Sequence, residues 1–174
     1  MRDILVSKIT VPTLDDKVIP RRKLYSKLSK ILQYPVTALT AGAGYGKTTT
    51  LVQYLSEKQQ RLPLGWYNLG PEDSSLYFFS IYLAAAMDSL FPGIKSWYCA
   101  HVEQEDDLSW NILFFSLMLG IEKFDTLEAE GYVVIDDWQS VQKDSDICTF
   151  FDRFLASIPA HIHVIILSRE YVNL

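Results

Sequence analysis

The sequence of 174 residues predicts an α/β protein in which a mostly parallel sheet is covered by helices on both faces. Three observations lead to this prediction. Short apolar runs rich in β-branched residues alternate with longer segments of helical spacing. A glycine-rich loop lies directly between one such run and the following helix. Two later apolar runs end in polar side chains, as strands do at the ligand-binding edge of a parallel sheet.

Four apolar runs are predicted to be strands. They read VTALT at 36–40, LGWYNLG at 64–70, GYVVIDD at 131–137 and HVIILSR at 163–169. Each is too short for a typical helix and is bounded by glycine, proline or charged residues. We expect them to be buried on both faces. The sequence ends five residues after the last run, so we expect it to stop before the last strand of the sheet and to be a fragment of a longer protein.

The segments between these runs are predicted to be helices. Apolar residues recur at helical spacing between Leu24 and Leu32, and Pro35 ends that segment. Further helices are predicted after the glycine loop, in 71–91, in 108–124 and from Ile147 to Ile158, where the spacing is strongly amphipathic. Residues 92–107 are expected to form a loop.

Composition excludes several classes of protein. Apolar residues make up 49% of the chain, which favours a packed globule over a disordered chain. The net charge of −5 argues against a nucleic-acid binder by bulk electrostatics. The two cysteines, Cys99 and Cys148, are too few for a disulfide framework or a zinc site and are expected to be reduced thiols. The most apolar segments fall short of the ~18 residues that a spanning helix needs, so we expect a cytoplasmic protein without membrane contact.

The stretch TAGAGYGKTTTL at 40–51 has the composition of a phosphate-binding loop. Such a loop points backbone N–H groups inward, which favours glycine, and it ends at a helix N-terminus that attracts anions. A lysine at that position reaches the β- and γ-phosphates, and the next hydroxyl can bind Mg²⁺. The alternative is a glycine-rich turn that caps a helix without a ligand. The candidate nucleotide-binding residues of this stretch are Ala41, Gly42, Ala43, Gly44, Tyr45, Gly46, Lys47, Thr48 and Thr49, of which Ala41 stands where the strict motif has glycine.

The run YVVIDD supplies two carboxylates at the edge of the sheet where this loop is expected. Magnesium needs oxygen ligands and keeps several waters, so Thr48 and Asp136 are the candidate Mg²⁺ ligands. Asp137, one residue further, is a candidate catalytic residue that orients or deprotonates an attacking water. The alternative for both carboxylates is a turn or helix cap after the strand.

Arg169, at the end of the last predicted strand, is the second candidate catalytic residue. A guanidinium there can bind a γ-phosphate and respond to its presence, with Ser168 as a further contact. The alternative is a surface ion pair with Glu170 or a neighbouring acid.

Taken together, these elements resemble the nucleotide-binding domain of the signal-transducing STAND ATPases. The chain is similar to the bacterial branch typified by the maltose-regulon activator, whose members usually end in a LuxR-type DNA-binding domain. The motifs that carry the resemblance are SKITVP with VIPRRKLYSKL, AGYGKTT, GWYNLGPED, YVVIDDWQSV and VIILSR, in this order and over nearly the whole chain.

The resemblance implies a P-loop NTPase fold of the additional-strand type, a three-layer sandwich in which strand 163–168 lies between strands 36–40 and 131–135. It implies that residues 1–34 form a lead-in and helix near the adenine, with Val18 to Arg21 beside the base and Arg21 as a further nucleotide-binding residue. It also implies that residues 35–174 form the NTPase core. It also implies ATP or ADP and Mg²⁺ as cofactors, a closed ADP state, and self-association of the full-length protein in the ATP state. DNA would be bound only through a domain outside this chain.

Three functions stay open on the sequence. The first is a nucleotide switch in a transcription regulator, with slow ATP hydrolysis at most. The second is a stand-alone P-loop kinase, which would need an acceptor pocket and an arginine-rich lid. The third is a scaffold with a vestigial site, which the alanine at position 41 would permit.

Overall fold

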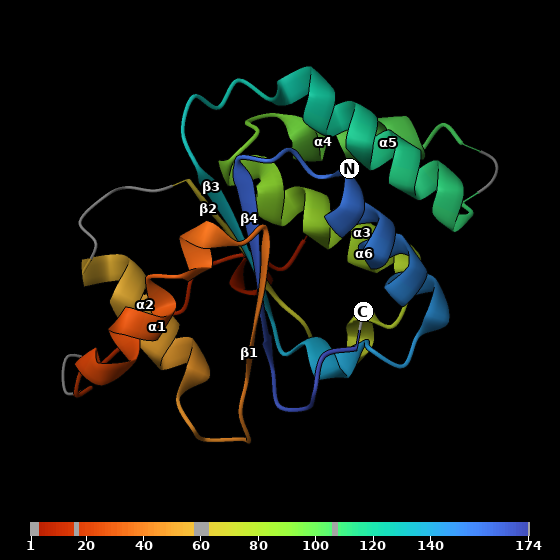
Figure 1. Cartoon of the computed structure of the whole chain (residues 1–174). Helices are drawn as coiled ribbons and strands as arrows, with labels where there is room; N and C mark the ends of the chain where they lie inside the picture. The colour runs from red at the N-terminus through yellow and green to blue at the C-terminus, as the bar shows by residue number, and fades with distance from the viewer. Residues whose placement is uncertain (1–3, 16–17, 58–62, 106–107, 174) are drawn as a thin grey trace.

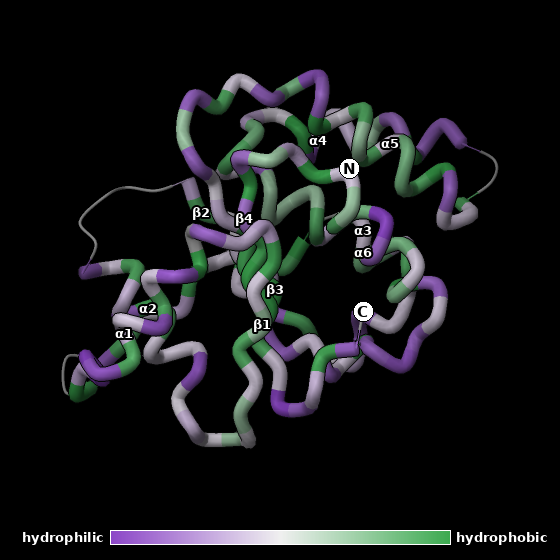
Figure 2. Tube along the Cα trace, viewed as in Figure 1, coloured by the Kyte–Doolittle hydropathy of each residue, from purple (hydrophilic) through white to green (hydrophobic). Residues whose placement is uncertain are grey.

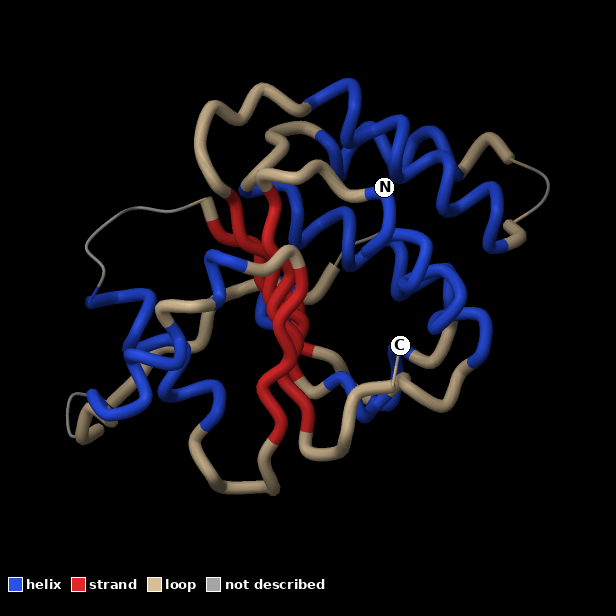
Figure 3. Tube along the Cα trace, viewed as in Figure 1, coloured by secondary structure: helices blue, strands red, loops and turns tan. Residues whose placement is uncertain are grey.

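The computed structural model describes residues 4–15, 18–57, 63–105 and 108–173. Within them, four strands form one sheet in the order β1-β4-β3-β2 (Figures 1 and 3). The strands are β1 (Val36–Thr40), β2 (Leu64–Asn68), β3 (Gly131–Asp136) and β4 (Ile162–Ser168), and every neighbouring pair is parallel. The predicted α/β class and the insertion of β4 between β1 and β3 are therefore confirmed.

Helices cover both faces of the sheet, which gives three layers (Figure 1). One face carries α1 (Tyr25–Leu28) and α2 (Lys47–Glu57). The other carries α3 (Leu76–Ala86), α4 (Ile94–Val102), α5 (Trp110–Phe124) and α6 (Ser145–Ser157). Within the described residues, no helix combines the length and the hydrophobicity that crossing a bilayer requires.

The strands divide their side chains between two cores. Tyr132 and Val134 of β3 pack with α1 and α2, whereas Val133 and Ile135 pack with α3 to α6. This follows from the period of two along a strand. Because both faces are covered, all six residues of β3 are buried, and the strands form an apolar band through the centre of the molecule (Figure 2).

The helix predicted between Leu24 and Leu32 is shorter than expected. The structure has a turn of 3-10 helix at Arg22–Leu24, the short α1, and a second 3-10 turn at Ile31–Gln33. Side-chain hydroxyls compete with the helical hydrogen bonds here, because Ser29 Oγ donates to the carbonyl of Ser26 at 3.0 Å.

The prediction of a loop at 92–107 was wrong, because α4 occupies Ile94–Val102. Its buried residues, Ile94, Tyr98, Cys99 and Val102, have helical spacing. The residue that caps the start of α4 does not directly precede the helix but lies in the preceding turn. The Asp88 carboxylate accepts hydrogen bonds from the backbone N–H groups of Gly93 and Lys95 at 3.1 and 3.0 Å. Both cysteines are free thiols in this structure.

The segment before α1 passes from one face of the sheet to the other. Ile4 and Ile9 pack against the core of α3 to α6, while Val11 and Leu14 pack against the core of α1 and α2. A 3-10 turn at Val6–Lys8 lies against β2 between them. The predicted lead-in of residues 1–34 includes 1–3 and 16–17, which lie outside the described residues.

Candidate functional site

The glycine loop joins the end of β1 to the start of α2. Gly44 and Gly46 have φ of 74° and 73°, a left-handed conformation that favours glycine. Ala41 does not have a positive φ, and its N–H donates to the Ser168 carbonyl at 3.2 Å in continuation of the β1–β4 pairing. The alanine at this position therefore fits without backbone strain.

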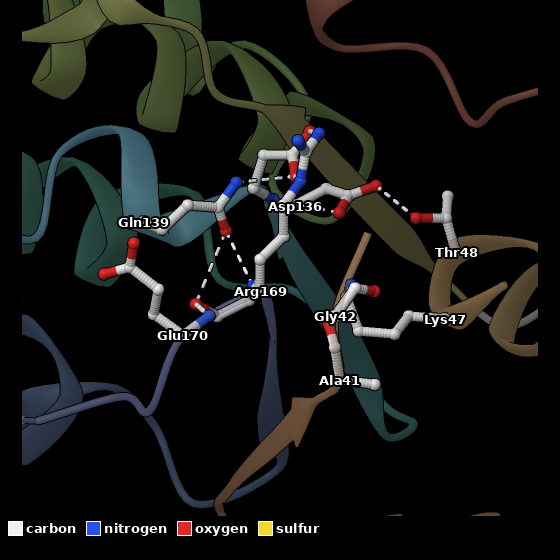
Figure 4. A network of polar contacts seen from close by, with 10 residues as sticks. Ala41, Gly42, Lys47, Thr48, Asp136, Gln139, Arg169 and Glu170 are labelled. Carbon is white, nitrogen blue, oxygen red and sulfur yellow. Dashed lines mark hydrogen bonds and ion pairs between the residues drawn. The ribbon is translucent and has the colours of Figure 1, made fainter. Parts of the chain in front are cut away.

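Lys47, the first residue of α2, lies back over the loop. Its Nζ donates to the carbonyls of Ala41 at 2.6 Å and Gly42 at 3.3 Å (Figure 4). Arg21 approaches from the lead-in and donates from Nη1 to the carbonyl of Tyr45 at 2.8 Å. Two cationic side chains from different segments are thus held by carbonyls of the same loop.

Thr48 and Asp136 meet across the edge of the sheet at which the strands end. The Thr48 hydroxyl donates to Asp136 Oδ2 at 2.9 Å, as Figure 4 shows. The other oxygen, Oδ1, accepts the backbone N–H of Asp137 at 2.9 Å. Residues that are 88 positions apart in the sequence therefore form one oxygen cluster.

Burial raises the pKa of the Asp136 carboxyl, and the nearby charge of Asp137 raises it further. The hydrogen bond from Thr48 acts in the opposite direction but does not cancel these effects. The ionised carboxylate is therefore held in an unfavourable environment, which a cation beside it would relieve.

The donor set at this position fits Mg²⁺. It consists of a hydroxyl and a carboxylate, both oxygen ligands, and Mg²⁺ takes few protein ligands and completes its octahedron with phosphate oxygens and water. Within the part of the chain that the structure describes, no group of three or more His, Cys, Asp or Glu side chains could hold a metal ion by itself.

Asp137 and Arg169 form an ion pair beside this cluster. Arg169 Nε lies 3.2 Å from Asp137 Oδ1, and the side chains are 52% and 31% exposed, respectively. Asp137 has φ of 58°, and among the described non-glycine residues it alone has a positive φ. The structure therefore shows Arg169 in an ion pair with a neighbouring acid, which was the alternative to a phosphate contact, and this acid is Asp137. Glu170 instead accepts a hydrogen bond from Gln142 at 2.6 Å.

Gln139 completes this group and was given no role from the sequence. Its Nε2 donates to Asp137 Oδ1 at 2.7 Å, and its Oε1 accepts the Arg169 backbone N–H at 2.9 Å. Ser168 is fully buried and its hydroxyl donates to the same Oε1 at 3.4 Å. The sequence signal for Gln139 was its place in IDDWQ, two residues after Asp137. Trp138 between them is buried, and the Gln139 side chain reaches the edge of the sheet.

Among the cavities that border the glycine loop, two share Gly46 and Thr49 in their linings. The first, of about 220 Å³, is lined by Ala43, Gly44, Gly46, Lys47, Thr48, Thr49, Asp137 and Arg169. The second, of about 600 Å³, is lined by Val18, Ile19, Arg21, Gly46, Thr49, Thr50 and Gln53. Gln53 Nε2 donates to the Val18 carbonyl at 3.2 Å and so ties the lead-in to α2. Candidate site residues from the loop, the end of β3, the end of β4 and the lead-in therefore converge on one region, and Asp136 joins it through its hydrogen bond with Thr48.

A parallel sheet in this strand order, with a glycine loop between β1 and α2 and a buried aspartate at the end of β3, defines a P-loop NTPase domain. A solved structure supports the fold. The Orc1 protein of Aeropyrum pernix, solved in complex with DNA, matches 88% of this chain and 40% of its own, with a TM-score of 0.57 and 17% sequence identity. No family model matches the chain.

The sequence relatives are more specific and confirm the resemblance to LuxR-family STAND ATPase regulators. The chain is 31% identical over 166 residues to the HTH-type transcriptional regulator MalT of Yersinia enterocolitica, a match that covers 95% of the chain. It is 30% identical over 171 residues to MalT of Yersinia pestis, covering 98% of the chain. The chain spans 18% of the length of these relatives.

Proposed function

We propose that the chain is the ATP- and ADP-binding switch domain of a bacterial multidomain transcription regulator, with slow ATP hydrolysis at most. The observation that carries this proposal is the convergence of Lys47, Thr48 and Arg169 on the 220 Å³ cavity beside the glycine loop. Two chain segments that are distant in sequence contribute to this small volume: the start of α2 supplies a phosphate lysine and a magnesium hydroxyl, and the end of β4 supplies a guanidinium.

In this proposal the smaller cavity holds the phosphates. Backbone N–H groups of 42–46 and the N-terminus of α2 face the β-phosphate. Lys47 exchanges its loop carbonyls for phosphate oxygens, which are stronger acceptors because they are charged. Thr48 and Asp136 hold Mg²⁺, which neutralises phosphate charge when it is bound.

The larger cavity holds the adenosine part. Val18 and Ile19 provide apolar surface and backbone groups for a planar base, and Gly46 and Thr49 lie at the junction with the phosphate cavity. Its volume of about 600 Å³ falls in the range of small-molecule sites. The lead-in of residues 1–34 then belongs to the nucleotide site, and residues 35–174 form the core.

The remaining parts of the proposal concern the longer protein. MalT relatives are transcriptional regulators by name, so DNA binding is assigned to a domain outside this chain and the protein to the cytoplasm, where DNA is accessible. A triphosphate-dependent change in this domain would favour self-association, because contacts to the γ-phosphate are available in one nucleotide state alone.

The test is a calorimetric titration of the chain with ADP and with Mg-ATP, repeated with Lys47→Ala. Removal of this charge-assisted phosphate contact should weaken binding by about 2–4 kcal/mol. Lys30→Ala is the matched control, since Lys30 is a solvent-exposed lysine of the lead-in. Equal affinity in the Lys47 variant would contradict the proposal and favour the scaffold, whereas rapid transfer of phosphate to an added small acceptor would favour the kinase.

A further inference from the structure

Gln139 connects the ends of two neighbouring strands. It lies in the 3-10 turn Trp138–Ser140 that follows β3, and its amide reaches the end of β4. Nε2 donates to Asp137 Oδ1 at 2.7 Å, while Oε1 accepts from the Arg169 N–H at 2.9 Å (Figure 4). One side chain therefore fixes a carboxylate and the backbone of the arginine that pairs with that carboxylate.

The position of this amide is set by the core. Trp138, the preceding residue, is fully buried, and its ring lies 4.5 Å from that of Phe151 between centroids. The left-handed backbone of Asp137 turns the chain between the strand and this anchor. Since Trp138 cannot shift without disrupting the packing, it restrains the backbone from which the Gln139 side chain reaches its two partners.

The Asp137 carboxylate shares one oxygen between two donors. Oδ1 accepts from Gln139 Nε2 at 2.7 Å and from Arg169 Nε at 3.2 Å, and the second guanidinium contact, Nη2 to Oδ2, is longer at 3.5 Å. The guanidinium is half-exposed and lines the cavity of the glycine loop. An anion in this cavity would therefore compete with Asp137 for Arg169.

We propose that Gln139 is a positioning residue that allows the Arg169 guanidinium to move from Asp137 to the terminal phosphate of a bound triphosphate. When the guanidinium leaves, Nε2 of Gln139 still donates to Asp137, so the carboxylate keeps a partner and its orientation. Oε1 meanwhile holds the Arg169 backbone, so the side chain pivots about a fixed point. This inference rests on the proposed nucleotide site. It adds that Gln139 holds Asp137 and the Arg169 backbone in place, which allows the site to bind a triphosphate more tightly than ADP.

The test compares ADP with a non-hydrolysable imido analogue of ATP, both with Mg²⁺, for the chain and for Gln139→Met. Methionine keeps the length of the side chain and removes both hydrogen-bonding groups. The departure of Arg169 would then leave Asp137 without a side-chain donor. Triphosphate affinity should fall about three- to tenfold, as expected for a partly exposed hydrogen bond to a charged group, while ADP affinity stays within about twofold. Gln142→Met is the matched control, because Gln142 donates to the Glu170 carboxylate across the same two loops and is not among the residues that line the phosphate cavity.

A second experiment, in a variant that lacks the Arg169 guanidinium, distinguishes a positioning role of Gln139 from a general structural role. In Arg169→Ala there is no guanidinium to move, so adding Gln139→Met should change the ratio of triphosphate to ADP affinity by less than about twofold. Gln139→Glu supplies a further check if the methionine variant does not fold, since it retains the acceptor for the Arg169 N–H but removes the donor to Asp137. Its ratio should also fall.

The outcomes are distinguishable. Equal losses for both nucleotides, or the same change of ratio in the Arg169→Ala background, would overturn the role of Gln139 while leaving nucleotide binding intact. A wild-type chain that binds neither nucleotide would overturn this inference and the proposed function together.

Discussion

Two charged clusters lie beyond the strand ends at the same edge of the sheet, and they differ mainly in burial. Beyond β2, the Lys8 ammonium pairs with Asp73 and lies 2.7 Å from Glu72 Oε1, with side chains of Lys8 and Asp73 only 9% and 1% exposed. Beyond β3 and β4, Arg169 pairs with Asp137 with side chains that are 52% and 31% exposed. Each pair borders a cavity, but the side chains of the first pair are almost completely covered, whereas those of the second are open to solvent at the cavity of the glycine loop.

This difference separates a structural ion pair from an exchangeable one. Burial by itself lowers the pKa of Lys8, but the hydrogen bonds and charges of Asp73 and Glu72 outweigh burial, so the net pKa is raised. Asp73 also accepts the Gly70 N–H at 2.7 Å, so the pair organises the turn after β2 as well as the lead-in. Water and ligands can replace the partners of an exposed guanidinium, but they cannot replace those of a buried ammonium at comparable cost.

The largest expected effect comes from Lys8→Met. The substitution keeps the side chain's apolar length but leaves the buried Asp73 carboxylate without its cation. Loss of one partner of a buried pair should lower the free energy of unfolding by about 3–5 kcal/mol. Urea denaturation followed by tryptophan fluorescence would measure this change.

Lys30→Met is the control, because Lys30 is solvent-exposed. It should leave the free energy of unfolding within about 0.5 kcal/mol of the wild-type value. If Lys8→Met changed the free energy of unfolding as little as Lys30→Met, the buried pair would contribute little to stability. Burial would then not be the property that distinguishes the two clusters.

Asp136 lies between these extremes, because it is buried but faces the proposed cation site. Its pKa is raised above the ordinary value of 3.8 in the folded chain, chiefly by burial. The unfolded chain therefore releases this proton at lower pH, and the free energy of unfolding should fall as pH rises from 3.8 through the folded pKa.

Asp136→Asn removes this titration. Measured with EDTA present, its stability relative to the wild type should increase over that pH window and then stay constant. The same variant should lose the Mg²⁺-dependent part of nucleotide binding. A stability difference that is independent of pH would show that burial does not disfavour the ionised carboxylate.

The sequence predicted the parts of the molecule whose signals are local. The four strands are short apolar runs, and the glycine loop is contiguous with its lysine and hydroxyl, so position along the chain was sufficient. Helix α4 was missed because its N-terminal N–H groups are satisfied by Asp88 from the preceding turn. Gln139 and the Lys8–Asp73 pair were missed for a related reason, since their partners come from segments 30 and 65 positions away, respectively.

The smallest expected effect on stability comes from Arg169→Met. An ion pair this exposed should contribute less than about 1 kcal/mol to the free energy of unfolding, because solvent and salt screen it. Its effect on ligand discrimination should be larger than its effect on stability, since the guanidinium is the group proposed to contact the terminal phosphate. Thermal unfolding and the ratio of triphosphate to ADP affinity, measured on the same preparation, would test both statements. A large loss of stability with an unchanged ratio would assign Arg169 to the same class as Lys8, and the contrast between the buried and the exposed cluster would no longer hold.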